Sequence, residues 1–312
     1  MIKKIINKIN RRLSKVNLSS SDEYTEYFFE NLNIRLKNNH ALSVYQKKFP
    51  LYDRFLPVLC SNLDGLIIDV GANIGDTIIS IFDQNKQSFI VGIEPDDLFF
   101  TECKYNINTN KLNHRFLGIQ KFLTTNKGSF SLEKSSTQST GAIFENLNDE
   151  SKINTISFAE VIKLIPLEKR AKFDLLKIDT DGFDWDVINS FLDYSKTSDL
   201  KPRFIFFEMQ TYMNNIGFHD KNRDKISERY KLAIENLAVV GYNYFGVFDN
   251  FGTPLKITKS IEDIFEINEY IKRSQVFNSN ATIYYLDVLA FTSEDLNYVN
   301  DSVFRFLNKS KR

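Results

Sequence analysis

Glycine and proline are both scarce in this sequence, which has 12 glycines and 6 prolines among its 312 residues. Collagen-like, disordered and linker sequences are rich in these residues, so the scarcity excludes those classes. Cysteine is almost absent, and Cys60 and Cys103 lack the spacing of a disulfide framework or a CxxC motif, which favours a reducing compartment. The few glycines are unevenly placed, because Gly71 and Gly75 lie close together directly after an apolar run.

The chain also lacks an excess of charge, with 40 Lys and Arg residues against 40 Asp and Glu residues. A balanced charge provides no overall attraction to nucleic acid, and we predict no nucleic-acid partner. No apolar run reaches the ~18–20 residues of a membrane span, and no signal-peptide core follows the first lysines. We therefore expect a cytoplasmic protein.

Several catalytic signatures are missing as well. The sequence contains no GxSxG elbow and no P-loop, which excludes the enzyme classes that depend on them. Its three histidines are too far apart for a histidine-based zinc site: His40, His114 and His219.

The first 17 residues combine apolar residues at helical spacing with lysines and arginines between them. This pattern favours a helix that packs on the body with a solvated basic face. The alternative is a helix that makes peripheral contact with the inner face of a membrane, or with a partner. Residues 20–60 continue with helical spacing, so we predict an N-terminal helical extension over 1–60 and a basic C-terminal tail over 296–312.

From residue 66 onward, short apolar runs alternate with helical patterns. Strands are expected at 66–70, 89–94, 116–122, 173–179, 204–209, 242–248 and 283–291. Such alternation predicts a mostly parallel sheet with helices on both faces, in one α/β domain over 61–295. The polar stretch 124–157 is expected to form a hairpin and a long loop, and we expect this loop to contact the substrate.

The first strand ends in a glycine-containing turn, Asp69-Val70-Gly71-Ala72-Asn73-Ile74-Gly75-Asp76. Ligands of open α/β sheets bind at the carboxyl ends of the strands, where glycines allow close approach of the backbone. Asn73 and Asp76 stand where a dinucleotide fingerprint has glycines, and the acids would repel a pyrophosphate. The same acids, Asp69 and Asp76, suit the positively charged ammonium and sulfonium groups of S-adenosylmethionine (SAM). The alternative is a tight turn in which Asp76 caps the next helix.

Glu94 ends the second strand, about 20 residues after Gly75. An acid at this distance is placed to accept hydrogen bonds from both ribose hydroxyls of an adenosine ligand. The alternative is an exposed charge before Pro95.

Three more acids follow later strands: Asp179, Asp181 and Glu208. Such a cluster can act as a general base for a hydroxyl group, or hold a divalent cation through its oxygen atoms. In the alternative, Asp181 caps the following helix and Glu208 pairs with Lys177 or Arg203.

These segments resemble the FkbM-type SAM-dependent methyltransferases of the class I methyltransferase superfamily. The matching segments are IDVGANIGD at 68–76, GIEP at 92–95, DLLKIDTDGFD at 174–184 and FE at 207–208, with weaker agreement at 241–252 and 284–291. The resemblance implies a class I (Rossmann-like), mostly parallel, seven-stranded sheet whose last strand is antiparallel. It also implies SAM as methyl donor and, usually, O-methylation of sugar hydroxyls or natural products.

On the matching positions, the resemblance implies that Asp69, Gly71, Asn73 and Gly75 hold the methionine part of SAM and that Glu94 holds the ribose. Asp179 and Asp181 would lie beside the transferred methyl group. The chain departs from the family at Asp181, where Glu is usual, and at 122–125, where FLTT replaces a segment with a small residue and an acid.

We therefore predict a SAM-dependent O-methyltransferase with a small-molecule or glycan acceptor. The alternatives are a non-catalytic SAM-fold scaffold in a glycan-assembly complex and an NAD-dependent oxidoreductase. The turn around Asp76 disfavours the oxidoreductase.

Overall fold

The computed structural model describes residues 24–38, 40–125, 130–134, 140–144, 154–211, 223–278 and 282–309. The predicted basic helix over residues 1–17 and much of the predicted loop over 124–157 lie outside these ranges.

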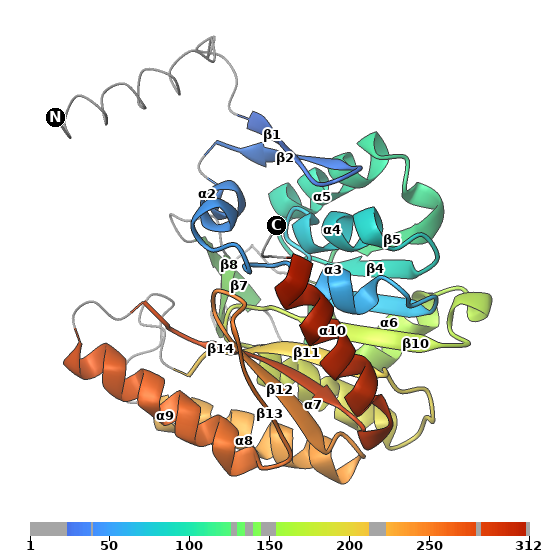
Figure 1. Ribbon diagram of the computed structural model, residues 1–312. Helices are drawn as coiled ribbons and strands as arrows, with labels where there is room; N and C mark the ends of the chain where they lie inside the picture. The colour runs from blue at the N-terminus through green and yellow to red at the C-terminus, as the bar shows by residue number, and fades with distance from the viewer. Residues whose placement is uncertain are drawn as a thin grey trace, which may run out of the picture.

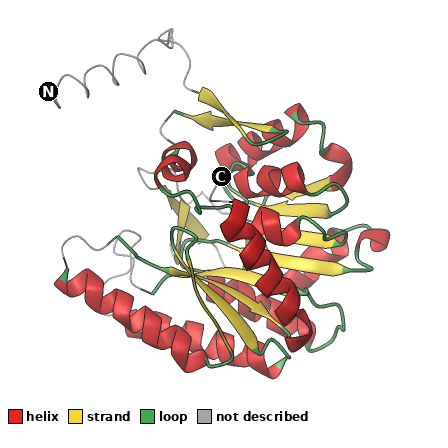
Figure 2. Cartoon of the chain, in the orientation of Figure 1, coloured by secondary structure: helices red, strands yellow, loops and turns green. Residues whose placement is uncertain are grey.

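A large mixed sheet forms the centre of the molecule, with strand order β13-β12-β14-β11-β10-β3-β4-β5 (Figures 1 and 2). Strands β5, β4, β3, β10 and β11 are parallel, and β14 is antiparallel to both β11 and β12. The strands are β3 (Leu66–Val70), β4 (Phe89–Ile93), β5 (Phe116–Ile119), β10 (Phe173–Ile178), β11 (Phe204–Met209), β12 (Tyr244–Asp249), β13 (Pro254–Thr258) and β14 (Leu286–Phe291). The mostly parallel sheet with an antiparallel last strand is confirmed.

The prediction of seven strands was wrong by one edge strand. β13 pairs antiparallel with β12 and makes the sheet eight-stranded. Most of its side chains are partly or fully exposed, so the sequence shows no apolar run there. An edge strand contacts one neighbour and needs less apolar surface than a central strand.

Helices cover both faces of the sheet (Figure 1). One face carries α3 (Phe55–Cys60), α4 (Asp76–Gln84), α5 (Asp97–Thr109) and α10 (Leu296–Lys309), and the other carries α6 (Phe158–Leu164), α7 (Asp184–Ser195), α8 (Arg223–Val239) and α9 (Ile261–Phe277). Short 3-10 turns occur at Asn113–Arg115, Leu167–Lys169 and Ser293–Asp295. No helix in the described ranges is long and apolar enough to cross a bilayer.

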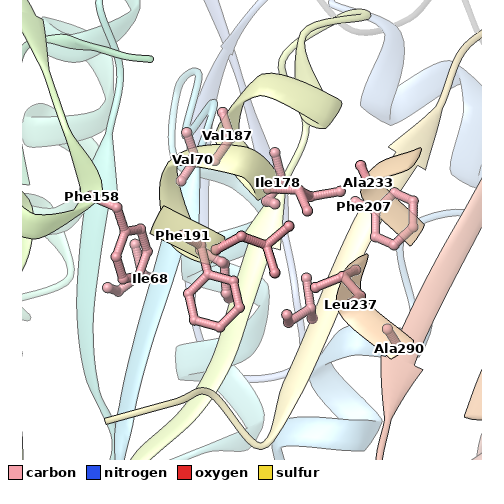
Figure 3. Packing of buried hydrophobic residues seen from close by; sticks show 14 of the residues in the cluster. Ile68, Val70, Phe158, Ile178, Val187, Phe191, Phe207, Ala233, Leu237 and Ala290 are labelled. Atoms are coloured by element: carbon pink, nitrogen blue, oxygen red, sulfur yellow. The ribbon is translucent and has the colours of Figure 1, made fainter. Parts of the chain in front are cut away.

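Two buried clusters, one on each face, explain the continuous apolar runs of the parallel strands. Ile68 and Val70 of β3 pack against Phe158 and Phe191 on one face (Figure 3), whereas Ile67, which precedes Ile68, belongs to the cluster of the opposite face. Successive strand residues point to opposite faces, so a strand covered on both sides is apolar at nearly every position.

The N-terminal extension is not helical throughout, which corrects the prediction for residues 20–60. β1 (Tyr24–Phe28) and β2 (Asn33–Lys37) form an antiparallel hairpin before α2 (Ala41–Lys48). In β2, Ile34 and Leu36 are buried while their neighbours are only half-buried, which is the period of a strand. The hairpin turn is bound by Asp83, whose Oδ1 accepts hydrogen bonds from Asn31 N (2.6 Å) and Leu32 N (2.8 Å).

The C-terminal segment is a helix packed on the body rather than a separate basic tail. Val299 and Phe306 of α10 are fully buried. Tyr298 also donates a hydrogen bond from its hydroxyl group to Leu59 O in α3 (2.6 Å). The apolar stripe of α10 is what the charge-based expectation overlooked.

The stretch after β5 is partly described. The expected third strand is split into β5 and β6 (Phe122–Leu123), and β6 pairs with β9 (Thr155–Ile156). Between them β7 (Phe130–Lys134) and β8 (Thr140–Phe144) form the predicted hairpin.

Candidate functional site

The loop after β3 needs its glycines. Gly71 has a φ of +79°, and a Cβ atom there would lie 1.7 Å from Asp179 O, so the ends of β3 and β10 touch through backbone. Gly75 has a φ of +83° and caps α4, and a Cβ atom there would lie 2.9 Å from Cys103 Sγ. Asp76 is the first residue of α4 and not its N-cap, so the alternative of an Asp76 cap is wrong.

Glu94 is buried beside this loop, with 2% of its surface exposed. Its Oε2 accepts a hydrogen bond from Asn73 N (2.8 Å) and its Oε1 accepts one from Asp96 N (2.9 Å). Burial raises the pKa of Glu94 to about 7, although these two backbone donors oppose the rise. The alternative of an exposed charge is therefore wrong, and the first two strand ends come together as predicted.

A buried lysine joins the ends of β3 and β10. Lys177 stands opposite Asp69 in the ladder between these strands. Its Nζ lies 2.9 Å from Asp69 Oδ1 and 3.2 Å from Asp179 Oδ2. Burial disfavours the charged form of Lys177, but Asp179 and Asp69 together raise its pKa well above the usual value.

Asp69 keeps one unpaired oxygen. Only 1% of its surface is exposed, and its Oδ2 has no hydrogen-bond partner within the described ranges. Burial raises the pKa of Asp69 to about 6, and the neighbouring Lys177 limits the rise. A buried carboxylate oxygen without a donor is a suitable partner for a ligand's ammonium group.

Asp179, Asp181 and Glu208 converge as predicted. One carboxylate oxygen of each lies within 4.8 Å of those of the other two. Burial and the neighbouring Asp179 raise the pKa of Asp181 to about 8 and that of Glu208 well above its usual value. Carboxyl groups with such pKa values can exchange a proton near neutral pH.

Two residues that the sequence analysis did not single out fix this cluster. Asp184 accepts hydrogen bonds from Thr180 Oγ1 (2.7 Å), Thr180 N (3.1 Å) and Glu208 N (2.9 Å). Gln210 donates from Nε2 to Glu208 Oε2. The available signals were that Asp184 is the last residue of the matching segment 174–184 and that Gln210 follows the segment 207–208 closely.

The alternative roles of these acids are therefore wrong. The N-cap residue of α7 is Phe183, and no side chain among the described residues caps this helix, so Asp181 is not its cap. Lys177 pairs with Asp69 and Asp179, and Arg203 pairs with Asp295 (2.5 Å), so neither was found paired with Glu208 in the described structure.

The segment after β5 is held by an acid from another element. Asp186 of α7 accepts hydrogen bonds from Thr124 Oγ1 (2.6 Å) and Thr125 Oγ1 (2.6 Å). Asp186 thus fixes the conformation of the segment that follows β6.

A cleft opens beside the carboxylate cluster, with a cavity of about 60 Å³. Its floor includes Lys177, Asp179 and Glu208. Its walls come from residues 51–56 at the start of α3, from the end of β12 and the turn that follows it, and from the start of β14: Leu51, Tyr52, Asp53, Phe55, Leu56, Phe248, Asn250, Gly252, Tyr285 and Asp287. These three segments are far apart in the sequence, and their contact was not predicted.

Comparison with known proteins adds a sequence match. A family model described as "Methyltransferase FkbM domain" matches residues 69–244, a range that contains every predicted site residue. No curated protein matches the chain significantly.

Solved structures similar to this chain include an O-methyltransferase from Bacillus cereus in complex with SAH (14% identity, 81% of this chain and 89% of that chain, TM-score 0.42). The O-methyltransferase TomG from Streptomyces achromogenes in complex with SAM is 11% identical, over 83% of this chain and 92% of that chain (TM-score 0.42). Methyltransferase FkbM from Methylobacillus flagellatus is 12% identical, over 59% of this chain and 39% of that chain (TM-score 0.37).

Proposed function

The chain belongs to the FkbM methyltransferase family, and we propose that it transfers the methyl group of SAM to a hydroxyl oxygen of a sugar, a glycan precursor or a natural product. One observation carries the proposal: the unpaired, buried Oδ2 of Asp69 lies at the strand edge that also holds the Gly71 loop and Glu94. This combination suits an amino acid joined to a nucleoside.

The residues fit SAM. Asp69 would accept a hydrogen bond from the ammonium group, and Glu94 would accept from the ribose hydroxyls. The positive φ angles of Gly71 and Gly75 permit a close approach of the backbone to the ligand. When bound, SAM supplies an activated methyl group. The chain's own contribution is to orient the acceptor hydroxyl and to remove its proton.

Glu208 and Asp181 are the groups that we propose for the proton. Their burial and mutual repulsion favour the protonated form, so either carboxylate readily takes up a proton from a hydroxyl. The same oxygens with Asp179 offer ligands for a divalent cation. Methyl transfer after dialysis against EDTA, with and without added Mg²⁺, distinguishes the two routes.

Calorimetric titration with S-adenosylhomocysteine (SAH) tests the cofactor. We expect the wild type to bind, Glu94→Ala to lose binding, and Glu235→Gln, which changes an exposed carboxylate on α8, to bind like the wild type. Absence of binding by the wild type would overturn the proposal. A glycan-precursor panel incubated with labelled SAM, with mass spectrometry as readout, then tests acceptor and O-methylation.

The segment 1–17 suggests a second property. We propose that its basic amphipathic pattern brings the enzyme to an anionic membrane surface. The full chain should cosediment with vesicles containing phosphatidylglycerol and a chain without residues 1–17 should not. Equal cosedimentation of both would contradict this.

A further inference from the structure

The cleft beside the carboxylate cluster has a wall that is held in a fixed shape. In the turn after β12, Asp249 Oδ1 accepts hydrogen bonds from Phe251 N (2.9 Å) and Thr253 N (2.8 Å). Asn250 Oδ1 accepts one from Tyr284 N (3.0 Å), which ties the turn to the segment before β14. The turn is thus held by hydrogen bonds at both ends.

The same turn packs closely on the N-terminal extension. The rings of Phe49 and Phe251 stack with centroids 3.8 Å apart. Gly252 has a φ of +80°, and a Cβ atom there would lie 2.5 Å from Leu51 O. Segments from the two ends of the chain therefore form one wall, which encloses the space above Asp179 and Glu208.

The acidic groups that line this cleft outnumber the basic ones. Asp53, Asp179, Glu208 and Asp287 contribute carboxyl groups, and among the described lining residues Lys177 is the only basic one. Burial raises the pKa of Asp53 to about 7 and that of Asp287 well above its usual value, and a bound ammonium group would favour their ionised forms. Lys177 already lies between two carboxylates.

One of these acids lacks a partner for one of its oxygens. Glu208 is 6% exposed. Its Oε2 accepts from Gln210, whereas Oε1 has no hydrogen-bond partner in the part of the chain that the structure describes. Asp287 is its neighbour across the β11–β14 ladder. An acceptor in the cleft that receives no hydrogen bond from the described chain can accept one from a bound ligand.

Aromatic rings complete the lining: Tyr52, Phe55, Phe206, Phe248 and Tyr285. Ring faces attract cations and cover the apolar faces of small molecules. Rings and carboxylates together favour a compound that is cationic or neutral, and they disfavour an anion.

We propose that this cleft holds the methyl acceptor and selects a hydroxyl compound that carries a protonated amine, in preference to neutral compounds and against anionic ones. This inference rests on the proposed methyl transfer, because the cleft borders the carboxylates that would take the proton. The amine satisfies the unpaired carboxylate oxygen and reduces repulsion among the acids.

Three sugars with the same ring test the order of preference: methyl glucosaminide, methyl glucoside and methyl glucuronide. Their binding to the SAH-loaded protein is measured by ligand-observed NMR in buffer of low ionic strength. We expect the amine to bind at least tenfold more tightly than the acid, with the neutral sugar between them. Equal or tighter binding of the glucuronide, or no binding of the glucosaminide, would overturn the proposal.

Single substitutions test whether the carboxyl groups of the cleft cause the preference for the amine. Asp53→Asn and Asp287→Asn should each reduce the ratio of amine to acid affinity severalfold, because each removes one cleft carboxylate. Asp193→Asn should leave the ratio unchanged, since Asp193 is an exposed partner of Lys196 on α7. An unchanged ratio in both cleft variants would contradict this assignment.

The outcome is separable from that of the proposed function. Failure of the wild type to bind SAH refutes the methyltransferase proposal, whatever the sugars do. Normal SAH binding with the wrong order of sugar affinities refutes only the assignment of the cleft.

Discussion

Replacement of Lys177 by methionine should make cofactor binding depend on pH in a new way. Lys177 is buried, and its ammonium lies 2.9 Å from Asp69 Oδ1. Methionine keeps most of the side-chain volume and removes the charge. Asp69 then loses the cation that keeps it ionised, and a protonated Asp69 is a poor partner for the ligand's ammonium group.

The size of the effect follows from the pKa of Asp69, which burial raises to about 6 in the wild type. An opposite charge this close typically lowers a carboxyl pKa by roughly 1–3, so its loss should raise the pKa to ~8. At pH 7 the ionised fraction then falls from about 0.9 to about 0.1. The Kd for SAH should rise about tenfold at pH 7, and the ratio of variant to wild type should approach one by pH 9.

The other charged groups around Asp69 do not reverse this sign. Asp179 and Asp76 also raise its pKa, and Cys103 faces it from α5. The amine of SAH titrates in the same pH range, but this affects both proteins equally and cancels in the ratio.

Calorimetric titrations with SAH between pH 7 and pH 9 provide the assay, with thermal melting as a check on folding. Lys177→Arg, which keeps the charge, should bind like the wild type at every pH. Lys172→Met is the matched control, because Lys172 lies just before the other end of β10 and pairs with Asp174 at 3.6 Å. A ratio for Lys177→Met that stays near one, or stays high at pH 9, would refute the reasoning.

Three further predictions concern the same strand edge. Gly71→Ala should lower the free energy of unfolding by about 2–5 kcal/mol, from backbone strain and the collision with Asp179 O, whereas Gly241→Ala, with nothing within 4 Å, should cost about 1–2 kcal/mol in urea denaturation. Glu94→Gln should weaken SAH binding roughly ten- to a hundredfold at pH 8. It should also reduce the loss of affinity expected for the wild type as pH falls below about 7, leaving the smaller loss due to Asp69, which titrations at pH 6 and 8 will measure. Asp184→Asn should cost about 1–3 kcal/mol in urea denaturation, because one amide oxygen cannot replace two carboxylate oxygens that accept three hydrogen bonds.

The strand edge was predictable because its residues lie at the ends of apolar runs. The runs before Asp69, Glu94 and Glu208 are buried on both faces. In parallel strands, the residues that follow such runs must meet at one edge. Lys177 was considered only as a partner of Glu208, although it is a charged residue within the fully buried strand β10. A lysine in such a position needs a carboxylate partner, and that requirement was the available signal.

The cleft wall could not be predicted, because its contacts join segments about 200 residues apart. Asp53 lies outside every matching segment, and the weaker family agreement at 241–252 and 284–291 does not indicate that these segments contact residue 53. The hairpin at 24–37 was misread for a related reason. Ile34 and Leu36 form the buried side of this hairpin, and they pack with Ile74 and Phe99. These contacts favour a strand over a helix, and the partners lie in a different part of the chain, so residues 24–37 alone do not reveal them.

The buried carboxyls of the site link ligand binding to stability. Burial raises the pKa of Asp69 to about 6 and that of Glu94 to about 7, so the folded chain binds more protons than the unfolded chain above pH 4. Stability must therefore fall as pH rises from the unfolded pKa values through the folded ones. For Glu94 the difference from 4.5 corresponds to roughly 3 kcal/mol. A ligand that brings an ammonium and hydroxyl donors to these oxygens reverses that loss, so the cofactor should stabilise the fold most above pH 7.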